Sequence, residues 1–552
     1  MLCFLGYWSV AELIRISNFS VPFDVETPLN MLAAKRLLLP PQAVSEVVIV
    51  RKALDARRYH GAPIRFVYVL DVKIKENEHR VLSKWKKDKN ISAAPESRGR
   101  QAGTGVADIM LEERPVVAGF GPAGMFAALT LARAGCSPIV LERGDDVDTR
   151  LTKINHFWHT GILDPNCNVQ FGEGGAGTFS DGKLTTRIND VHTREILEDF
   201  VAGGAPEEIL YLQKPHIGTD LLRGIVKWIR NEIIRLGGEI RFRSCLTKIV
   251  MDLDGKIAAL QINDEEEIKS SAVFLGIGHS ARDTYQMLFA QGVKMETKPF
   301  AIGVRIEHPQ ELINAAQYGE DAGSRKLPVA DYMLTYQDKL LNRGAYSFCM
   351  CPGGQVVAAA SENGCVVTNG MSNYKRDSGV ANSALLVTVS SEDFGRDVLS
   401  GIRFQQKYER LAFQIAGQDY KAPVQTVGDF LSGHFGSTDF MTAPTYLPGT
   451  SAVDLHRCLP KFVTDVLERA IPYFGQKITG FSANDVVMTG VETRSSAPCR
   501  ICRNPKSFMS ENIEGLYPIG EGAGYAGGIM SAAVDGMKAA LAFLESNMHT
   551  DR

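Results

Sequence analysis

The stretch RPVVAGFGPAG at residues 114–124 decides the fold of this 552-residue chain. A short apolar run ends at Ala118, and glycines at positions 119, 121 and 124 follow at once. We predict a strand that turns directly into a helix, then a second strand at 138–141 that ends at Glu142. This is the strand–turn–helix–strand order of a parallel α/β unit.

Each glycine of this stretch has a physical role in binding a dinucleotide. Gly119 permits the tight turn, Gly121 lets backbone N–H groups approach a diphosphate, and Gly124 lets helix and strand pack closely. The helix N-terminus adds partial positive charge for the phosphates. Glu142 is placed to accept both hydroxyls of an adenosine ribose and would repel a 2′-phosphate. A glycine-rich turn without a ligand is the alternative.

A second glycine-rich region, GLYPIGEGAGYAGGIMSAAV at 515–534, decides which dinucleotide is expected. Its order is strand, acid, glycine loop and helix. It is similar to the segment that closes the flavin site in proteins of the glutathione-reductase-like superfold. The similarity implies that Glu521 holds the ribityl chain and that the helix N-terminus faces the flavin C2 carbonyl. The cofactor is therefore predicted to be FAD.

Two further segments complete the predicted site. The loop FGEGGAGTFSDGKL at 171–184 resembles the one that lies along the diphosphate and isoalloxazine in that superfold, where Lys183 would tune the flavin potential. The strand SSAVFLGIGH at 270–279 resembles the one under the adenine half of FAD. No second complete GxGxxG follows a strand, so NAD(P)H is expected only as a transient electron donor.

The predicted cofactor-binding residues come from these four segments. They are Gly119, Gly121, Pro122, Ala123, Gly124, Glu142, Arg143, Gly174, Gly175, Thr178, Ser180, Lys183, Gly276, Gly278, Gly520, Glu521, Gly527, Gly528 and Ile529. The FAD is expected to be noncovalent, because no His or Cys stands in a recognisable attachment motif.

Composition limits the remaining classes of function. With 60 Lys+Arg against 63 Asp+Glu and a net charge of −3, the chain lacks the basic footprint of a nucleic-acid-binding protein. A hydrophobic content of 45% indicates a globular core. No apolar run is long enough for a membrane span, the N-terminal stretch does not read as a signal peptide, and the ten cysteines are not densely spaced. We expect a cytoplasmic protein with neither a nucleic-acid nor a membrane partner.

The predicted fold class is α/β: a Rossmann-like FAD-binding domain, an inserted β-rich substrate domain and a small N-terminal α+β domain. The N-terminal domain, at 14–76, has the order β-α-β-β, with its helix capped by Thr27 and beginning at Pro28. It is expected to dock a protein or cover the FAD domain. A charged, flexible linker is predicted at 77–113. The FAD-binding domain is predicted at 114–295 and 481–552, and the inserted β-rich cap at 296–480.

The chain resembles a family of uncharacterised bacterial FAD-dependent dehydrogenases, often labelled NAD(FAD)-utilizing dehydrogenases, from about residue 14 to 542. The motifs that carry the resemblance are LDAR (54–57), FVYV (66–69), GFGPAG (119–124), GEGGAGTFSDGK (172–183), GHSARD (278–283), FCMCPGG (348–354), NGMS (369–372), VETRSS (491–496) and the region 520–536. The resemblance implies FAD and redox chemistry but no substrate. Cys499 stands where the family usually has an apolar residue, which weakens any shared role for that thiol.

No catalytic residue is identified from the sequence. The candidates are Lys183, His279, Cys349, Cys351 and Arg494. His279 and Arg282 would meet a phosphate or substrate carboxylate, or His279 would only cap a helix. The Cys349-Met-Cys351 pair and the CxxC at 499–502 allow a four-thiolate metal site, a redox dithiol or packed thiols. Packed thiols are favoured and no metal is expected.

The predicted function is that of a FAD-dependent oxidoreductase that moves hydride or electrons between the flavin and an unidentified small organic substrate. One alternative is a non-catalytic FAD-binding redox sensor or scaffold whose N-terminal domain docks a partner. A flavin-dependent RNA-modifying protein is the other alternative, and the near-neutral charge argues against it.

Overall fold

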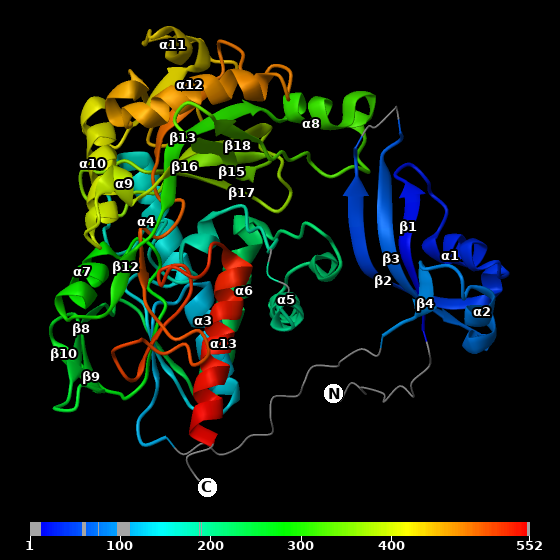
Figure 1. Ribbon diagram of the computed structural model, residues 1–552, viewed down its shortest axis with the longest axis horizontal. Helices are drawn as coiled ribbons and strands as arrows, with labels where there is room; N and C mark the ends of the chain where they lie inside the picture. The colour runs from blue at the N-terminus through cyan, green and yellow to red at the C-terminus, as the bar shows by residue number, and fades with distance from the viewer. Residues whose placement is uncertain are drawn as a thin grey trace. The chain divides into compact units, whose positions relative to one another are not determined.

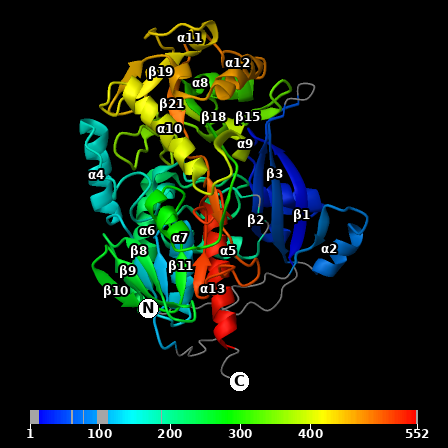
Figure 2. The same ribbon diagram turned by 60° about the vertical axis from the view of Figure 1, so that its left-hand side comes forward.

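The computed structural model describes residues 13–57, 62–75, 77–95, 111–186, 188 and 190–548 (Figures 1 and 2). The chain divides into two compact units. Unit 1 comprises residues 1–102, 206–215 and 317–328, and unit 2 comprises 103–205, 216–316 and 329–552. Residues 1–12 and residues 96–110 of the predicted linker lie outside the described residues.

Unit 1 contains a four-stranded antiparallel sheet in the order β2-β3-β1-β4. The strands are β1 (Ile14–Pro22), β2 (Val44–Asp55), β3 (Arg65–Ile74) and β4 (Ile91–Ala93). Helix α1 (Leu29–Leu37) packs Ala33, Ala34 and Leu37 into the same core as the sheet. The predicted β-α-β-β order is present. The helix begins one residue later than predicted, with Pro28 as its N-cap and no side-chain cap from Thr27.

The prediction of a flexible linker from residue 77 is wrong for its first part. Helix α2 (Glu78–Lys84) follows Asn77, whose side chain accepts a hydrogen bond from the Arg80 N–H at 3.2 Å. Strand β4 pairs with β1, and both Val81 and Ile91 are buried in the core of unit 1. The lysines around residue 86 dominate the local composition, but the apolar residues among them face the core.

Unit 2 is built on a five-stranded parallel sheet in the order β23-β11-β5-β6-β7. These strands are β5 (Val116–Ala118), β6 (Ile139–Leu141), β7 (Glu239–Arg241), β11 (Val273–Leu275) and β23 (Leu516–Pro518). Helix α3 (Pro122–Arg133) follows β5 as predicted, and α13 (Ile529–Met548) lies alongside it (Figure 1). Sheet β10-β9-β8 shares a hydrophobic core with β5 and β6. Its strands are β8 (Leu246–Met251), β9 (Ile257–Ile262) and β10 (Glu266–Lys269).

The β-rich part of unit 2 is a seven-stranded sheet in the order β14-β15-β18-β13-β21-β19-β20. Its strands are β13 (Phe300–Pro309), β14 (Thr335–Asp338), β15 (Arg343–Cys351), β18 (Val380–Val389), β19 (Ala422–Thr426), β20 (Thr450–Ala452) and β21 (Val487–Glu492). Strand β21 pairs with β13 and β19, so this sheet extends past the predicted domain boundary at 480. The smaller strands are β12 (Met295–Thr297), which pairs with β22 (Cys499–Ile501), and β16 (Gly354–Ala358), which pairs with β17 (Thr368–Ser372).

The remaining α-helices of the described residues connect these strands. They are α4 (Val147–Thr160), α5 (His192–Ala202), α6 (Gly218–Arg235), α7 (Arg282–Ala290), α8 (Gln310–Tyr318), α9 (Ser391–Phe394), α10 (Ser400–Ile415), α11 (Val427–Ser432) and α12 (Lys461–Gly475). Among the described residues, none of the helices combines the length and the apolar character that a membrane crossing requires.

The packing of α3 on β5 gives a first prediction. A Cβ at Gly124 would lie 1.9 Å from the Gly119 carbonyl oxygen, so Gly124→Ala forces the helix away from the turn. We expect a loss of about 1–3 kcal/mol in the free energy of unfolding, measured by urea denaturation. The matched control is Gly224→Ala on α6, where a Cβ meets no atom within 4 Å and the better helix former should stabilise the protein by about 0.5–1 kcal/mol. Equal effects of the two variants would contradict this account of the turn.

Candidate cofactor-binding site

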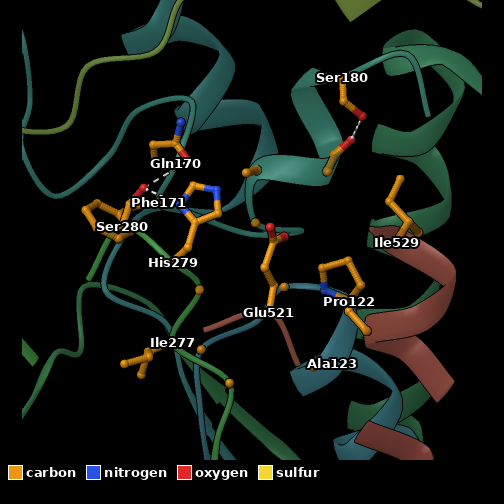
Figure 3. A pocket seen from close by; sticks show the side chains of 18 of the residues that line it. Pro122, Ala123, Gln170, Phe171, Ser180, Ile277, His279, Ser280, Glu521 and Ile529 are labelled. Atoms are coloured by element: carbon orange, nitrogen blue, oxygen red, sulfur yellow. Dashed lines mark hydrogen bonds between the residues drawn. The ribbon is translucent and has the colours of Figure 1, made fainter. Parts of the chain in front are cut away.

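A cavity of about 390 Å³ opens where the strands of the parallel sheet end (Figure 3). Its lining includes the residues that directly follow β5, β6 and β11, namely Gly119, Glu142 and Gly276. Ligands of open parallel sheets bind outside the carboxyl ends of the strands, and small-molecule sites are about 300–1,000 Å³ in volume. The cavity therefore has both the place and the size of a ligand site.

Glycines from distant segments meet around this cavity with almost no space between their backbones. A Cβ at Gly119 would lie 2.3 Å from the Gly276 carbonyl oxygen, and one at Gly175 would lie 2.9 Å from the Gly121 Cα. A Cβ at Gly522 would lie 2.7 Å from the Gly278 backbone. The four glycine-rich segments are thus in mutual contact, and side chains at these positions would push them apart.

Most of the predicted cofactor-binding residues line the cavity. Those that line it are Gly119, Gly121, Pro122, Ala123, Glu142, Arg143, Gly175, Ser180, Lys183, Gly276, Gly278, Glu521, Gly527, Gly528 and Ile529. Gly124, Gly174, Thr178 and Gly520 do not. Their glycines have packing roles instead: a Cβ at Gly174 would meet the Thr178 hydroxyl at 2.0 Å, and one at Gly520 would meet the Ala123 Cβ at 2.6 Å.

The Glu142 carboxylate is already engaged by the backbone. Its oxygens accept hydrogen bonds of 2.9 Å from the N–H groups of Phe120, Gly144 and Gly172. A carboxylate offers about four lone-pair positions, so one is left for a ligand. The acid therefore joins the GxGxxG turn to the loop at residue 172, and the binding of both ribose hydroxyls by Glu142 stays a prediction for which the structure leaves limited capacity.

The Arg143 guanidinium forms one side of the same end of the cavity. It stacks on the Phe171 ring at 4.4 Å and donates to the Asp283 carboxylate at 2.8 Å. The same nitrogen lies 3.0 Å from the Cys245 sulfur. Because the arginine is held on both its face and its edge, it presents a fixed, flat surface to the cavity.

Glu521 is an acid without a side-chain hydrogen bond to any described residue, and it lines the centre of the cavity (Figure 3). Burial raises the pKa of its carboxyl to about 7, while Lys298 lowers it by a smaller amount. The carboxyl is half-buried and faces the cavity, so it is available to a ligand that can donate hydrogen bonds. The α3 N-terminus, the glycine contacts and this acid together fit FAD: the backbone N–H groups suit the diphosphate, and the carboxyl suits hydroxyl groups.

Lys183 and the two thiols of β15 form another part of the lining. The Lys183 ammonium donates to the Met350 carbonyl oxygen, between Cys349 and Cys351, which both line the cavity. Cys351 is buried, whereas Cys349 is exposed at the cavity wall, and desolvation raises the pKa of both thiols above its ordinary value. Both thiols are therefore protonated near neutral pH, and the more reactive thiolate is scarce.

Arg282 and Arg494 bind one buried carboxylate rather than a ligand. Glu409 on α10 receives two hydrogen bonds from Arg282, at 2.7 and 2.8 Å, and two from Arg494, at 2.9 and 3.1 Å. Glu362 adds a 2.6 Å bond to Arg282. The hypothesis that Arg282 meets a phosphate or a substrate carboxylate is wrong, since its side chain is only 3% exposed and its charge is already compensated. Arg494 does line the cavity, but through a guanidinium held by Glu409.

The four-thiolate metal hypothesis is also not supported. Cys499 lies on β22, and neither it nor Cys502 lines the cavity that contains Cys349 and Cys351. Across the part of the chain that the structure describes, no cluster of three or more His, Cys, Asp or Glu side chains is placed to hold a metal ion.

Several lining residues were not predicted from the sequence. Gln170, Phe171, Cys245, Ser280 and Thr284 all border the cavity. Ser280 lies within the GHSARD motif and Gln170 directly precedes the glycine loop, so their positions gave a usable signal. No sequence signal pointed to Glu409, which binds Arg282 and Arg494, because both arginines are more than 80 residues away in the chain.

The parallel sheet, the α3 turn and the cavity define an α/β protein with a candidate ligand site at the carboxyl ends of its strands. Residues 299–495 match the family model described as "FAD-dependent protein, C-terminal domain-like". The chain is 50% identical to an uncharacterized protein of Clostridium beijerinckii (strain ATCC 51743 / NCIMB 8052), over 96% of this chain and 98% of that protein. The chain belongs to the same family as this Clostridium protein.

Solved structures give only distant matches. A mutant of the halogenase PltM in complex with FAD matches with a TM-score of 0.39 and 9% identity, over 80% of this chain and 71% of that chain. The glycerol-3-phosphate dehydrogenase from Bacillus halodurans complexed with FAD matches with a TM-score of 0.34 and 11% identity, over 81% and 66%. L-proline dehydrogenase from P. horikoshii matches with a TM-score of 0.34 and 12% identity, over 79% and 95%.

The arginine pair around Glu409 gives a second prediction. Burial raises the pKa of the Glu409 carboxyl, but the two guanidinium groups outweigh burial and hold that pKa well below its usual range. Glu409→Gln leaves two buried arginines to share the partly exposed Glu362 as their remaining carboxylate, and we expect a loss of about 3–5 kcal/mol in the free energy of unfolding. The control is Glu362→Gln, whose side chain is 27% exposed and whose loss should cost about 1 kcal/mol. A loss for Glu409→Gln no larger than for the control would show that the cluster is not the support we describe.

Glu521 gives a third prediction, for the protein without FAD. Its pKa is about 7 when folded, against about 4.3 in an unfolded chain. The folded state therefore binds more protons between these values, and stability falls as pH rises through this window. In Glu521→Gln this contribution is absent, so Tm should fall less than in the wild type between about pH 5 and 8. Glu307, with a pKa raised to about 7, keeps its own contribution in both proteins. Identical pH profiles would contradict a raised pKa for the Glu521 carboxyl.

Proposed function

We propose that the protein is a FAD-dependent oxidoreductase that transfers hydride or electron pairs between a noncovalently bound flavin and a small organic substrate. The observation that carries the proposal is the meeting of four glycine-rich segments around one cavity, whose lining also includes residues of β15, in the seven-stranded sheet, and of β17. In such a cavity, one end of a bound dinucleotide would lie against backbone N–H groups and its other end would lie against side chains. When bound, FAD supplies the two-electron redox chemistry of its isoalloxazine ring.

The chain's own residues have separate tasks in this proposal. The N-terminus of α3, beginning at Pro122, binds the diphosphate through its backbone N–H groups and partial positive charge. Gly527 and Gly528, directly before α13, place that helix N-terminus against the flavin. Glu521 accepts hydrogen bonds from hydroxyl groups of the ribityl chain, which connects the diphosphate to the flavin ring.

The substrate would lie against the wall formed by Phe348, Cys349 and Asn369. The side-chain oxygen Oδ1 of Asn369 accepts a hydrogen bond from Arg305 at 3.2 Å. The side-chain nitrogen Nδ2 of Asn369 is therefore left to donate to a ligand. Lys183 adds a cation to the same lining. These donors suit a substrate with a carbonyl or carboxylate oxygen.

NAD(P)H is proposed only as a transient electron donor. The GxGxxG spacing recurs at 172–177 and 522–527, but neither copy joins a strand directly to a helix as 119–124 does. The proposal places the enzyme in the cytoplasm. It includes neither a nucleic acid nor a membrane among the partners, and it leaves unit 1 a role in docking a protein.

The direct test is spectroscopic. The purified protein should be yellow, or become so on reconstitution with FAD, and anaerobic NADH or NADPH should bleach the flavin band near about 450 nm. A preparation that stays colourless after reconstitution would overturn the proposal. Bound FAD that no donor in a broad panel reduces would instead support a non-catalytic redox sensor.

The thiols of β15 provide a control for the route of the electrons. Because the thiols of Cys349 and Cys351 are protonated near neutral pH, the double variant C349S/C351S should reduce its flavin at a rate within about 3-fold of the wild type. A loss of flavin reduction in this variant, with FAD still bound, would favour the redox dithiol over direct transfer.

A further inference from the structure

His279 belongs to a short chain of hydrogen bonds at the wall of the cavity (Figure 3). Its Nδ1 lies 2.9 Å from the Ser280 hydroxyl oxygen, and that oxygen lies 3.2 Å from Gln170 Oε1. The Gln170 amide nitrogen in turn donates to the Ala359 carbonyl oxygen at 3.3 Å. The chain thus begins at a fixed backbone oxygen and ends on the imidazole ring.

The direction of every bond in this chain follows from its fixed end. The Ala359 carbonyl can only accept, so the Gln170 NH₂ group faces it and Gln170 Oε1 faces Ser280. Oε1 also can only accept, so the single hydroxyl hydrogen of Ser280 points to Gln170. The Ser280 oxygen must then accept from His279, which places the ring hydrogen on Nδ1.

Desolvation and the neighbouring arginines keep the His279 ring neutral. Burial lowers the pKa of His279 to about 3, and Arg494 and Arg282 lower it further against the opposing effect of Glu409. A neutral ring with its hydrogen on Nδ1 has a lone pair on Nε2. Nε2 makes no hydrogen bond to a described residue, and the ring lines the cavity. His279 therefore offers the cavity a hydrogen-bond acceptor, and its low pKa makes it a poor proton acceptor in catalysis.

Two hydrogen-bond acceptors lie on this part of the cavity wall, and they determine which part of a ligand can bind beside them. His279 Nε2 is the first. Glu521 in its ionised form is the second, because its carboxylate has no side-chain partner among the described residues. Phosphate oxygens only accept hydrogen bonds and would be repelled here, whereas hydroxyl groups can donate to both residues. The segment of the ligand at this place must carry hydroxyls.

We propose that His279 Nε2 accepts a hydrogen bond from a hydroxyl of the FAD ribityl chain, with Ser280 and Gln170 fixing the tautomer. The inference rests on the proposed function, since it requires FAD in this cavity. His279 is then a positioning residue for the cofactor and not the catalytic base. The diphosphate lies on the α3 side, and the polyol lies between His279 and Glu521.

The chain contains a natural control for the tautomer. His308 on β13 is fully buried and, like His279, neutral, since burial lowers its pKa to about 4. Its Nε2 lies 2.9 Å from the Phe481 carbonyl oxygen, which can only accept, so the hydrogen of His308 is on Nε2. The two histidines are therefore expected in opposite tautomers in one protein.

The first experiment is ¹⁵N NMR of the imidazole nitrogens in the FAD-free protein, with signals assigned through H279F and H308F. The expected result is an Nδ1–H tautomer for His279 and an Nε2–H tautomer for His308. In Ser280→Ala the acceptor of the Nδ1–H is lost, and His279 should shift toward the Nε2–H form. An Nε2–H tautomer for His279 in the wild type would overturn the inference without affecting the proposal that FAD binds.

The second experiment measures the Kd of FAD and of its 2′-, 3′- and 4′-deoxyribityl analogues with the wild type and with H279F. Loss of the correct hydroxyl should weaken binding to the wild type by about 3- to 10-fold and to H279F by less than about 2-fold. Equal losses in both proteins for all three analogues would overturn the inference. If H279F does not fold, Ser280→Ala serves as the second variant and should show the same reduced sensitivity. Failure of the wild type to bind FAD at all would overturn the proposed function as well.

Discussion

The whole site depends on how closely backbones approach one another at the end of the parallel sheet. The Gly119 turn, the strand before Gly276 and the loop at Gly175 come together at distances that leave no space for a Cβ. This contact lets α3 begin directly at the cavity and brings its N-terminal N–H groups to the edge of the space. The glycine-free parts of the lining, such as Glu521 and His279, then project side chains into a cavity whose shape the backbone has already fixed.

Buried ion pairs hold the β-rich part of unit 2 against the sheet. Arg282 on α7 and Arg494 after β21 share Glu409 on α10, and Arg305 on β13 binds Glu492 at 2.9 Å. Burying charges is costly unless each is paired and hydrogen-bonded, and here each guanidinium has a carboxylate partner. The pairs keep the cationic residues near the cavity from acting as free anion sites, and their positive charge also helps to keep His279 neutral.

The sequence allowed the α/β core to be predicted because its signals are local. The strand before Gly119, the helix after it and the acid at 142 follow one another within about 30 residues, as a dinucleotide fold requires. The predictions failed where the deciding partner is distant. The helix at 78–84 looked like a charged linker because its buried Val81 faces strands far along the chain. Glu142 looked free for a ribose because no pattern shows that three backbone N–H groups already bind it.

The central claim is that one molecule of FAD occupies the cavity between the α3 turn and the α13 turn. A crystal structure of the protein grown with FAD tests it most directly. The account predicts density for the diphosphate at Gly121 and Pro122, and for the flavin at Gly527 and Gly528. Density for FAD at another place on the molecule, or an empty cavity at saturating FAD, would contradict it.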